Sequence, residues 1–280
     1  MKISKRYLFF NKYILICLLV PTISSFFSWA VFSEYFSALF IWDLSAMSVT
    51  RQEYFEMIFP FYNYPSDGFS MIQLILPVFP MLFVIPFLNL KKNLVFSYPR
   101  IKSYKRAVLQ TVSKHLLYGC FVLFFSYLIF LLIGVALLPM TPNPGVPGEL
   151  FSEFLGENFY QNHMLLYFVL EGFIKYFIFP FIYGLLAIAI SFLTPKNYLC
   201  ILIPIAYYAV LAVCVAILES AFRIDILFLS PTYTVVASSR PYTNIFVVLA
   251  PLLPPLMFSI AVIVRDMVKT KNRGDVFAIA

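Results

Sequence analysis

The residues best placed to do chemistry in this 280-residue chain are Glu171 and Lys175, which interrupt a long apolar stretch. They stand four apart with the acid N-terminal to the base, the order that favours an ion pair on one face of a helix. Buried inside a membrane helix, such a pair would be a candidate proton relay. At a membrane interface it would be a salt bridge whose lysine stem follows apolar surface while its ammonium reaches water. We favour the interfacial ion pair and keep the buried relay as the alternative.

Metal and disulfide chemistry has little support in the sequence. His115 and His163 are far apart, at the edges of apolar segments. The four cysteines lie inside apolar runs without Cys-x-x-Cys spacing, which is typical of small core residues; they are Cys17, Cys120, Cys200 and Cys214. We therefore expect no metal and no bound cofactor in this chain.

The common motifs of hydrolytic enzymes are missing too. The sequence has no Gly-x-x-x-x-Gly-Lys-Ser/Thr phosphate loop, no His-Glu-x-x-His pair and no Gly-x-Ser-x-Gly turn. We expect the chain not to be an enzyme, and any use of ATP and Mg²⁺ would take place in a partner.

Composition predicts the elements that position these residues. Hydrophobic residues make up 62% of the chain and charged residues 12%, and this much apolar surface cannot be hidden in a soluble domain of this size. Runs of about 20 apolar residues match the thickness of a bilayer. The sequence predicts a single all-α, polytopic membrane domain with six transmembrane helices, at 13–32, 71–90, 116–138, 176–193, 198–218 and 245–264.

The charges predict how these helices are oriented. With both termini in the cytoplasm, 16 of the 20 basic residues fall in inner segments and 10 of the 13 acids in outer ones, with Glu171 of the ion pair left out of the count. This is the asymmetry of the positive-inside rule. The net charge of +7 is therefore a topology signal, and nucleic-acid binding is the poorer interpretation. The outer segments are then 33–70, 139–175 and 219–244.

Two features of the spans have alternative interpretations. Ser28-Trp29-Ala30 follows basic residues and an apolar run, as in a signal peptide, although Trp29 is unusual in a cleavage motif of small residues; we favour a retained first span. Prolines inside spans favour a transporter with interrupted helices, although proline is also generally commoner in membrane helices. They are Pro77, Pro80, Pro86, Pro180, Pro204, Pro251, Pro254 and Pro255.

The outer segments contain two predicted short helices. Thr50 to Glu53 forms a capping-box pattern that opens a helix over 50–58. Ser230 before Pro231 predicts a second helix that ends near Ser238.

The largest inner segment, 89–115, has seven basic and no acidic residues. Its apolar and aromatic side chains beside arginine are typical of a protein-binding surface, and equally of an amphipathic piece lying on anionic lipid. The candidate contact residues are Lys91, Lys92, Asn93, Leu94, Val95, Phe96, Ser97, Tyr98 and Arg100.

This layout resembles the permease subunit of bacterial ABC exporters of the ABC-2 type. The resemblance is in the basic interfacial segment 1–12, the proline-rich run 76–86, the inner motif 103–106 and the Pro-Lys-Asn-Tyr start of the fifth span at 195–198. It implies a coupling helix at 91–98 that docks on a separate ATPase subunit. It also implies pairing with a second permease copy or a homologous permease, for which the small residues Ala187, Ser191, Ala212 and Ala216 are candidates, although packing within the chain is the commoner use of such residues.

The expected function is the permease subunit of an ATP-driven exporter in a bacterial plasma membrane. The alternative is a membrane receptor or immunity-type protein that binds a peptide or a partner at its outer face. The aromatic, acidic outer segments at 54–64 and 149–160 favour this second function.

Overall fold

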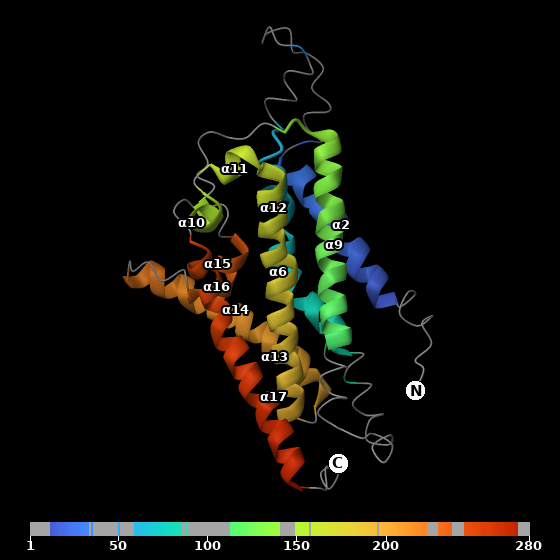
Figure 1. Cartoon of the computed structure of the whole chain (residues 1–280), viewed down its shortest axis with the longest axis vertical. Coiled ribbons are helices and arrows are strands. Elements are labelled where there is room, and N and C mark those ends of the chain that lie inside the picture. The colour runs from blue at the N-terminus through green and yellow to red at the C-terminus, as the bar shows by residue number, and fades with distance from the viewer. Residues whose placement is uncertain are drawn as a thin grey trace. The chain divides into compact units, whose positions relative to one another are not determined.

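The computed structural model describes residues 12–33, 35, 50, 59–85, 88, 113–140, 149–156, 158–194, 196–222, 229–236 and 244–273. Within these residues all regular structure is helical and no strand occurs (Figure 1). The predicted all-α class is confirmed.

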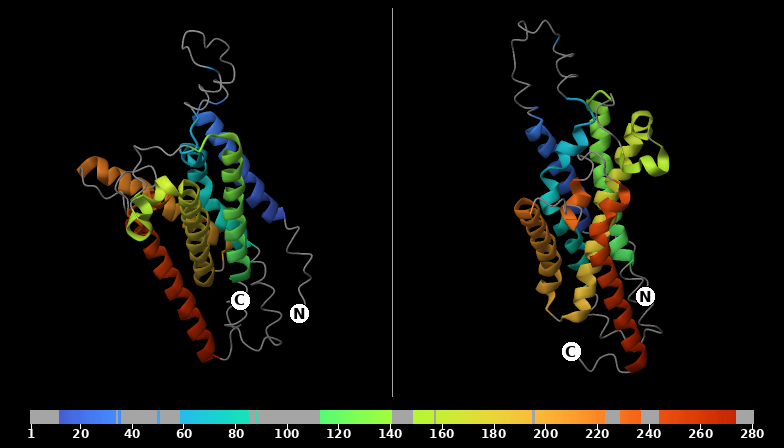
Figure 2. Two further views of the ribbon diagram at one scale, coloured as in Figure 1. Left: turned by 45° about the horizontal axis from the view of Figure 1, so that its top comes forward. Right: turned by 90° about the vertical axis from the view of Figure 1, so that its left-hand side faces the viewer.

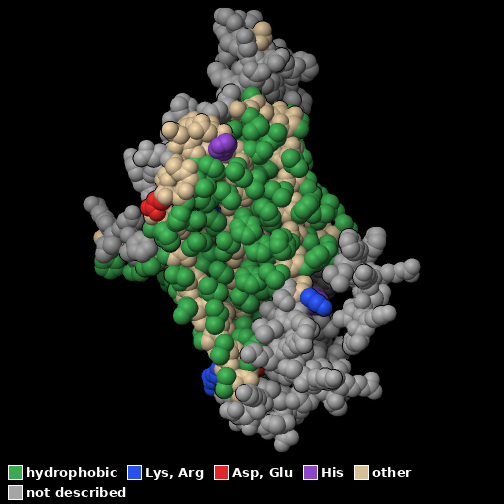
Figure 3. Space-filling model, in the orientation of Figure 1, with side chains coloured by type: hydrophobic (Ala, Val, Ile, Leu, Met, Phe, Trp, Pro, Cys, Tyr) green, Lys and Arg blue, Asp and Glu red, His purple; other side chains and the backbone are tan. Residues whose placement is uncertain are grey.

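In the part of the chain that the structure describes, five helices are long and apolar enough to cross a bilayer. They cover Ile14–Phe32, Lys114–Leu137, Met164–Leu193, Asn197–Phe222 and Ile245–Val268. Large hydrophobic side chains cover the exposed faces of α9 (Tyr118–Leu137) and α17 (Leu253–Arg273), as Figure 3 shows; Phe125 and Met257 are examples, with exposed fractions of 61% and 66%. Such faces suit lipid rather than water, so the chain has the architecture of a helical membrane protein.

The second predicted span is shorter and interrupted in the described residues. α5 (Tyr64–Phe69) precedes it. Within the span, α6 (Ile72–Ile75) leads into a 3₁₀ turn, η2 (Leu76–Val78), and the chain continues as a helix to Ile85. Pro77 lies in the 3₁₀ turn, where its missing N–H prevents a regular α-helical hydrogen bond. The described residues thus contain five long apolar helices and one shorter one, Leu76–Ile85, where six similar spans were predicted.

Other helix boundaries also differ from the predicted ones. α14 (Asn197–Phe222) and α17 both extend beyond the predicted fifth and sixth spans. The sixth begins with α16 (Ile245–Leu249) and a 3₁₀ turn, η9 (Ala250–Leu252), which contains Pro251. The helix over 50–58 lies outside the described residues apart from Thr50, whereas α15 (Pro231–Val236) confirms the helix predicted after Ser230. The Ser230 hydroxyl accepts a hydrogen bond from the Thr232 N–H at 3.3 Å, as a helix cap does.

The chain packs as two compact units, and the first contains residues 1–75, 122–176 and 235–248. In it, α2 (Lys12–Phe32) packs against α5 around an aromatic core. Trp29 is 1% exposed and meets the Tyr64 ring at a centroid distance of 5.0 Å. Tyr64 stacks on Phe130 of α9 at 4.2 Å and donates a hydrogen bond to the Phe130 carbonyl. Ser28, Trp29 and Ala30, the residues of the possible cleavage motif, are therefore part of this core.

The second unit contains residues 76–121, 177–234 and 249–280. There α13 (Phe179–Leu193) packs against both α14 and α17, as the right-hand view of Figure 2 shows. Phe179 stacks on Tyr183 at 4.5 Å, and Tyr208 of α14 meets Phe179 edge-on. Of the small residues considered for pairing between permeases, Ala187 and Ser191 are buried inside this unit, whereas Ala216 on α14 is exposed.

Candidate functional site

Glu171 and Lys175 lie on one continuous helix that runs from Met164 to Leu193. Glu171 belongs to α12 (Met164–Phe173), and Lys175 to the π-helical turn η6 (Ile174–Ile178) that joins α12 to α13. Pro180 follows this turn and has no N–H to donate to the carbonyl one turn earlier. A widened turn just before a proline relieves the clash of its ring with that carbonyl, and π turns within α-helices are frequent at functional sites.

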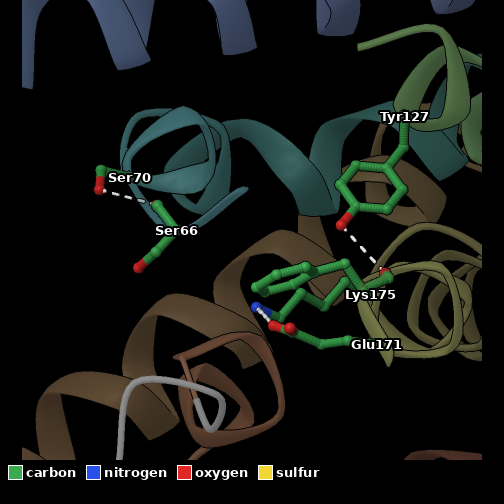
Figure 4. Close-up of polar contacts among 6 residues, drawn as sticks. Ser66, Ser70, Tyr127, Glu171 and Lys175 are labelled. Atoms are coloured by element: carbon green, nitrogen blue, oxygen red, sulfur yellow. Dashed lines mark hydrogen bonds and ion pairs between the residues drawn. The ribbon is translucent and has the colours of Figure 1, made fainter. Parts of the chain in front are cut away.

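The two side chains form the predicted ion pair (Figure 4). Their exposed fractions are only 5% for Glu171 and 7% for Lys175, so the lysine does not extend to water. This differs from the favoured expectation, because the charges are enclosed by the protein and the helix begins well before the predicted span at 176–193. The Lys175 Nζ instead lies 4.7 Å from the centre of the Phe69 ring, where the ring face attracts the ammonium.

Tyrosine side chains enclose the pair on the side of α9. The Tyr127 hydroxyl donates a hydrogen bond to the Phe168 carbonyl at 3.0 Å, one turn before Glu171. The Tyr127 ring stacks on Tyr176 at 4.6 Å with 18° between the ring planes. It fits because Gly172 has no side chain, since a Cβ atom there would collide with the ring.

Three buried tyrosines lie on or beside the helix that carries Glu171: Tyr167 in α12, Tyr176 in η6, and Tyr127 of α9 through its hydrogen bond to Phe168. Tyr176 is itself hydrogen-bonded to the Ser25 side chain of α2. Sequence inspection did not single out these tyrosines. Gly172, directly after Glu171, was the feature of the sequence that could have indicated them, because a glycine in a helix allows a large neighbouring side chain to approach closely.

The two carboxylate oxygens of Glu171 differ in their partners. Oε1 pairs with Lys175, whereas the buried Oε2 has no hydrogen-bond partner among the described residues. A buried acceptor without a donor costs about 1–3 kcal/mol, and more when it is charged. The carboxylate can therefore accept a further donor, whether a proton, a water molecule or a cation.

A second set of polar contacts joins α2 to the end of α5. Ser28 of α2 donates a hydrogen bond to the backbone carbonyl of Asp67 at 2.6 Å and accepts one from the Met71 N–H at 3.2 Å. Asp67 lies on α5, outside the predicted spans, and burial raises the pKa of its carboxyl from 3.8 to about 6. Its protonation is therefore sensitive to mildly acidic pH.

The other predicted site residues lie outside the described residues. This holds for the whole candidate coupling helix 91–98 and for Arg100. Within the described part of the chain, no three histidine, cysteine or acidic side chains come together as a metal site would require. Cys17, Cys120 and Cys200 are buried thiols, as expected, but Cys214 is exposed on α14.

The segment after residue 148, which was predicted to lie outside, contains short helices. It forms a 3₁₀ turn, η5 (Glu149–Phe151), followed by α10 (Ser152–Leu155) and α11 (Phe159–Asn162). The Asn244 amide donates a hydrogen bond to the Glu153 carboxylate, and the Phe154 and Phe246 rings pack with their centroids 5.6 Å apart. Phe154 nevertheless remains 61% exposed.

No family model, no curated protein and no solved structure matches this chain.

Proposed function

We propose that this chain is the membrane-spanning permease subunit of an ATP-binding-cassette exporter of the ABC-2 type, in a bacterial plasma membrane. The observation that supports this most is a set of apolar helices, two of them interrupted by a 3₁₀ turn that contains a proline, in a sequence without a phosphate-binding loop. Such a chain has helices that can rearrange but no site of its own for ATP. The energy for transport then comes from a separate ATPase subunit that holds ATP and Mg²⁺.

The basic segment 89–115 is the proposed contact with that ATPase. Closure of an ATPase pair on ATP would move the coupling helix at 91–98 and shift the bundle between inward-facing and outward-facing states. Phe96 and Tyr98 would provide apolar anchors for the ATPase, with the surrounding lysines and Arg100 forming the rim.

Co-purification tests this proposal. Tagged wild-type chain, expressed with its neighbouring genes, should capture an ATPase, and Phe96→Asp should reduce the amount captured at least tenfold. Phe154→Asp is the matched control, because it places the same charge on an exposed phenylalanine of a segment predicted to lie outside. The proposal fails if no ATPase is captured, if Phe96→Asp captures as much as wild type, or if a membrane-impermeant reagent labels Lys102 from outside the cell.

The second candidate function is a receptor or immunity-type protein that binds a peptide at the outer face. It is favoured by the folded segment 149–162, where the Glu153–Asn244 hydrogen bond holds α10 in place while Phe154 and Leu155 stay largely exposed. Binding of a peptide that Phe154→Asp abolishes, in a chain that exports nothing from vesicles, would establish this function instead.

A further inference from the structure

The buried carboxylate of Glu171 has a geometry that suits a second cation. We propose that Glu171 and the aromatic side chains around it bind a primary ammonium group of the cargo, and that Lys175 occupies this site when cargo is absent. This inference rests on the proposed export function and names the class of substrate: a molecule with an ammonium group next to an apolar body.

The position of the Lys175 ammonium shows which chemistry the site accepts. An ammonium group has three donors and one full charge, and here it meets a carboxylate oxygen and the face of an aromatic ring. These two partners, the Glu171 carboxylate and the Phe69 ring, are the ones that protein sites commonly use for ammonium ligands. A ligand ammonium would find the same partners.

The second oxygen of Glu171 gives an incoming ammonium a place to bind first. Oε2 is buried and has no partner among the described residues. The Tyr127 and Tyr176 hydroxyls are engaged with the Phe168 carbonyl and with Ser25. A donor that approaches Oε2 therefore satisfies an acceptor without breaking an existing hydrogen bond.

Lys175 can leave Glu171 by rotating its own side chain, because both residues lie one turn apart on the same helix. Departure without replacement would leave a buried carboxylate unpaired, which is strongly unfavourable. The favourable event is an exchange, in which the ligand ammonium arrives as the lysine ammonium departs. A neutral molecule of the same shape cannot drive this exchange, so the site selects for positive charge.

Equilibrium binding to the purified full-length chain in detergent tests the proposal. The probe is radiolabelled phenethylammonium, and the competitor is unlabelled 2-phenylethanol, which replaces the ammonium with a hydroxyl. We expect saturable binding to wild type that excess 2-phenylethanol does not displace. Lys175→Met should bind at least tenfold more tightly, because the internal competitor is gone, and Glu171→Gln at least tenfold more weakly. Glu219→Gln, which neutralises an acid on α14, should bind as wild type does.

A double variant keeps the test decisive if Lys175→Met does not fold. Glu171→Gln combined with Lys175→Met leaves no unpaired charge, and it should give a monodisperse protein that binds the probe at least tenfold more weakly than wild type. The proposal is overturned if wild type shows no saturable binding, if the double variant binds as wild type does, or if 2-phenylethanol competes as well as unlabelled phenethylammonium. Because this assay needs no ATPase, a failed co-purification would refute the exporter assignment alone, and failed ammonium binding would refute the cation site alone.

Discussion

Replacing Lys175 with methionine should destabilise the protein more than almost any other single conservative change. Methionine keeps most of the lysine stem but removes the ammonium that neutralises Glu171, whose side chain is only 5% exposed. Breaking a buried ion pair from one side costs about 3–5 kcal/mol, whereas replacing both partners with neutral groups is often neutral or stabilising. We therefore expect Lys175→Met to lose about 3–5 kcal/mol. The double variant Glu171→Gln, Lys175→Met should lie within about 1 kcal/mol of wild type.

Thermal unfolding of the detergent-purified chain measures this difference, followed by the loss of the monodisperse peak at one heating rate and in one detergent. At roughly 2–4 °C per kcal/mol for a chain of this size, Lys175→Met should unfold roughly 6–20 °C below wild type. The double variant should recover most of that loss. A Lys175→Met protein that unfolds with wild type, or a double variant as unstable as the single one, would show that the pair is solvated and refute the buried geometry.

Three further predictions concern the packing around this site. Ser28→Ala should lower the free energy of unfolding by about 1–2 kcal/mol, because the buried Ser28 hydroxyl makes two hydrogen bonds. Without it the Met71 N–H loses its partner, and the Asp67 carbonyl keeps only the Ser70 N–H. Ser70→Ala removes an exposed hydrogen bond to the Ser66 carbonyl (Figure 4) and should change the free energy of unfolding by less than about 0.5 kcal/mol. Equal losses of the two variants in thermal unfolding would contradict the bridging role of Ser28. Gly172→Ala should lower the free energy of unfolding by about 1–3 kcal/mol, because the new methyl group displaces the Tyr127 ring from its stack on Tyr176. An unfolding temperature equal to that of wild type would show that the ring has room to move. Asp67 should make the free energy of unfolding rise as pH falls from about 6 toward 4. Its carboxyl has a raised pKa in the folded protein, so over this range the folded protein binds a proton that the unfolded chain releases. Asp67→Asn should therefore make the unfolding temperature less dependent on pH over this range, and an unchanged pH dependence would contradict the prediction.

The ion pair shows how far reasoning from the sequence could go. The spacing of Glu171 and Lys175 predicts that they pair, since residues four apart on a helix face each other whatever surrounds the helix. Their burial could not be predicted in the same way. It depends on Tyr127, which lies on another helix, and on Phe69, which lies on a third. Neither contact leaves a mark in the sequence near residue 171 except the small residue Gly172.

The second predicted span illustrates a limit of hydropathy. Residues 71–90 are apolar except for Gln73 and Asn89, and a sliding average of hydropathy does not register the turn at Pro77 that interrupts the described helix. The proline was visible in the sequence. Whether it kinks a helix or interrupts it depends on what its neighbours pack against, and here Leu76 and Pro77 are buried.

The all-helical, membrane-type architecture and the approximate position of the long helices could be predicted from the amino-acid sequence. This was possible because the length and polarity of a run are local properties, and the thickness of a bilayer restricts them strongly. The burial of the two opposite charges, and the carboxylate oxygen without a donor among the described residues, became visible only in the folded protein. That outcome depends on side chains brought together from distant parts of the chain, and burial of this kind arises from packing rather than from spacing along one helix.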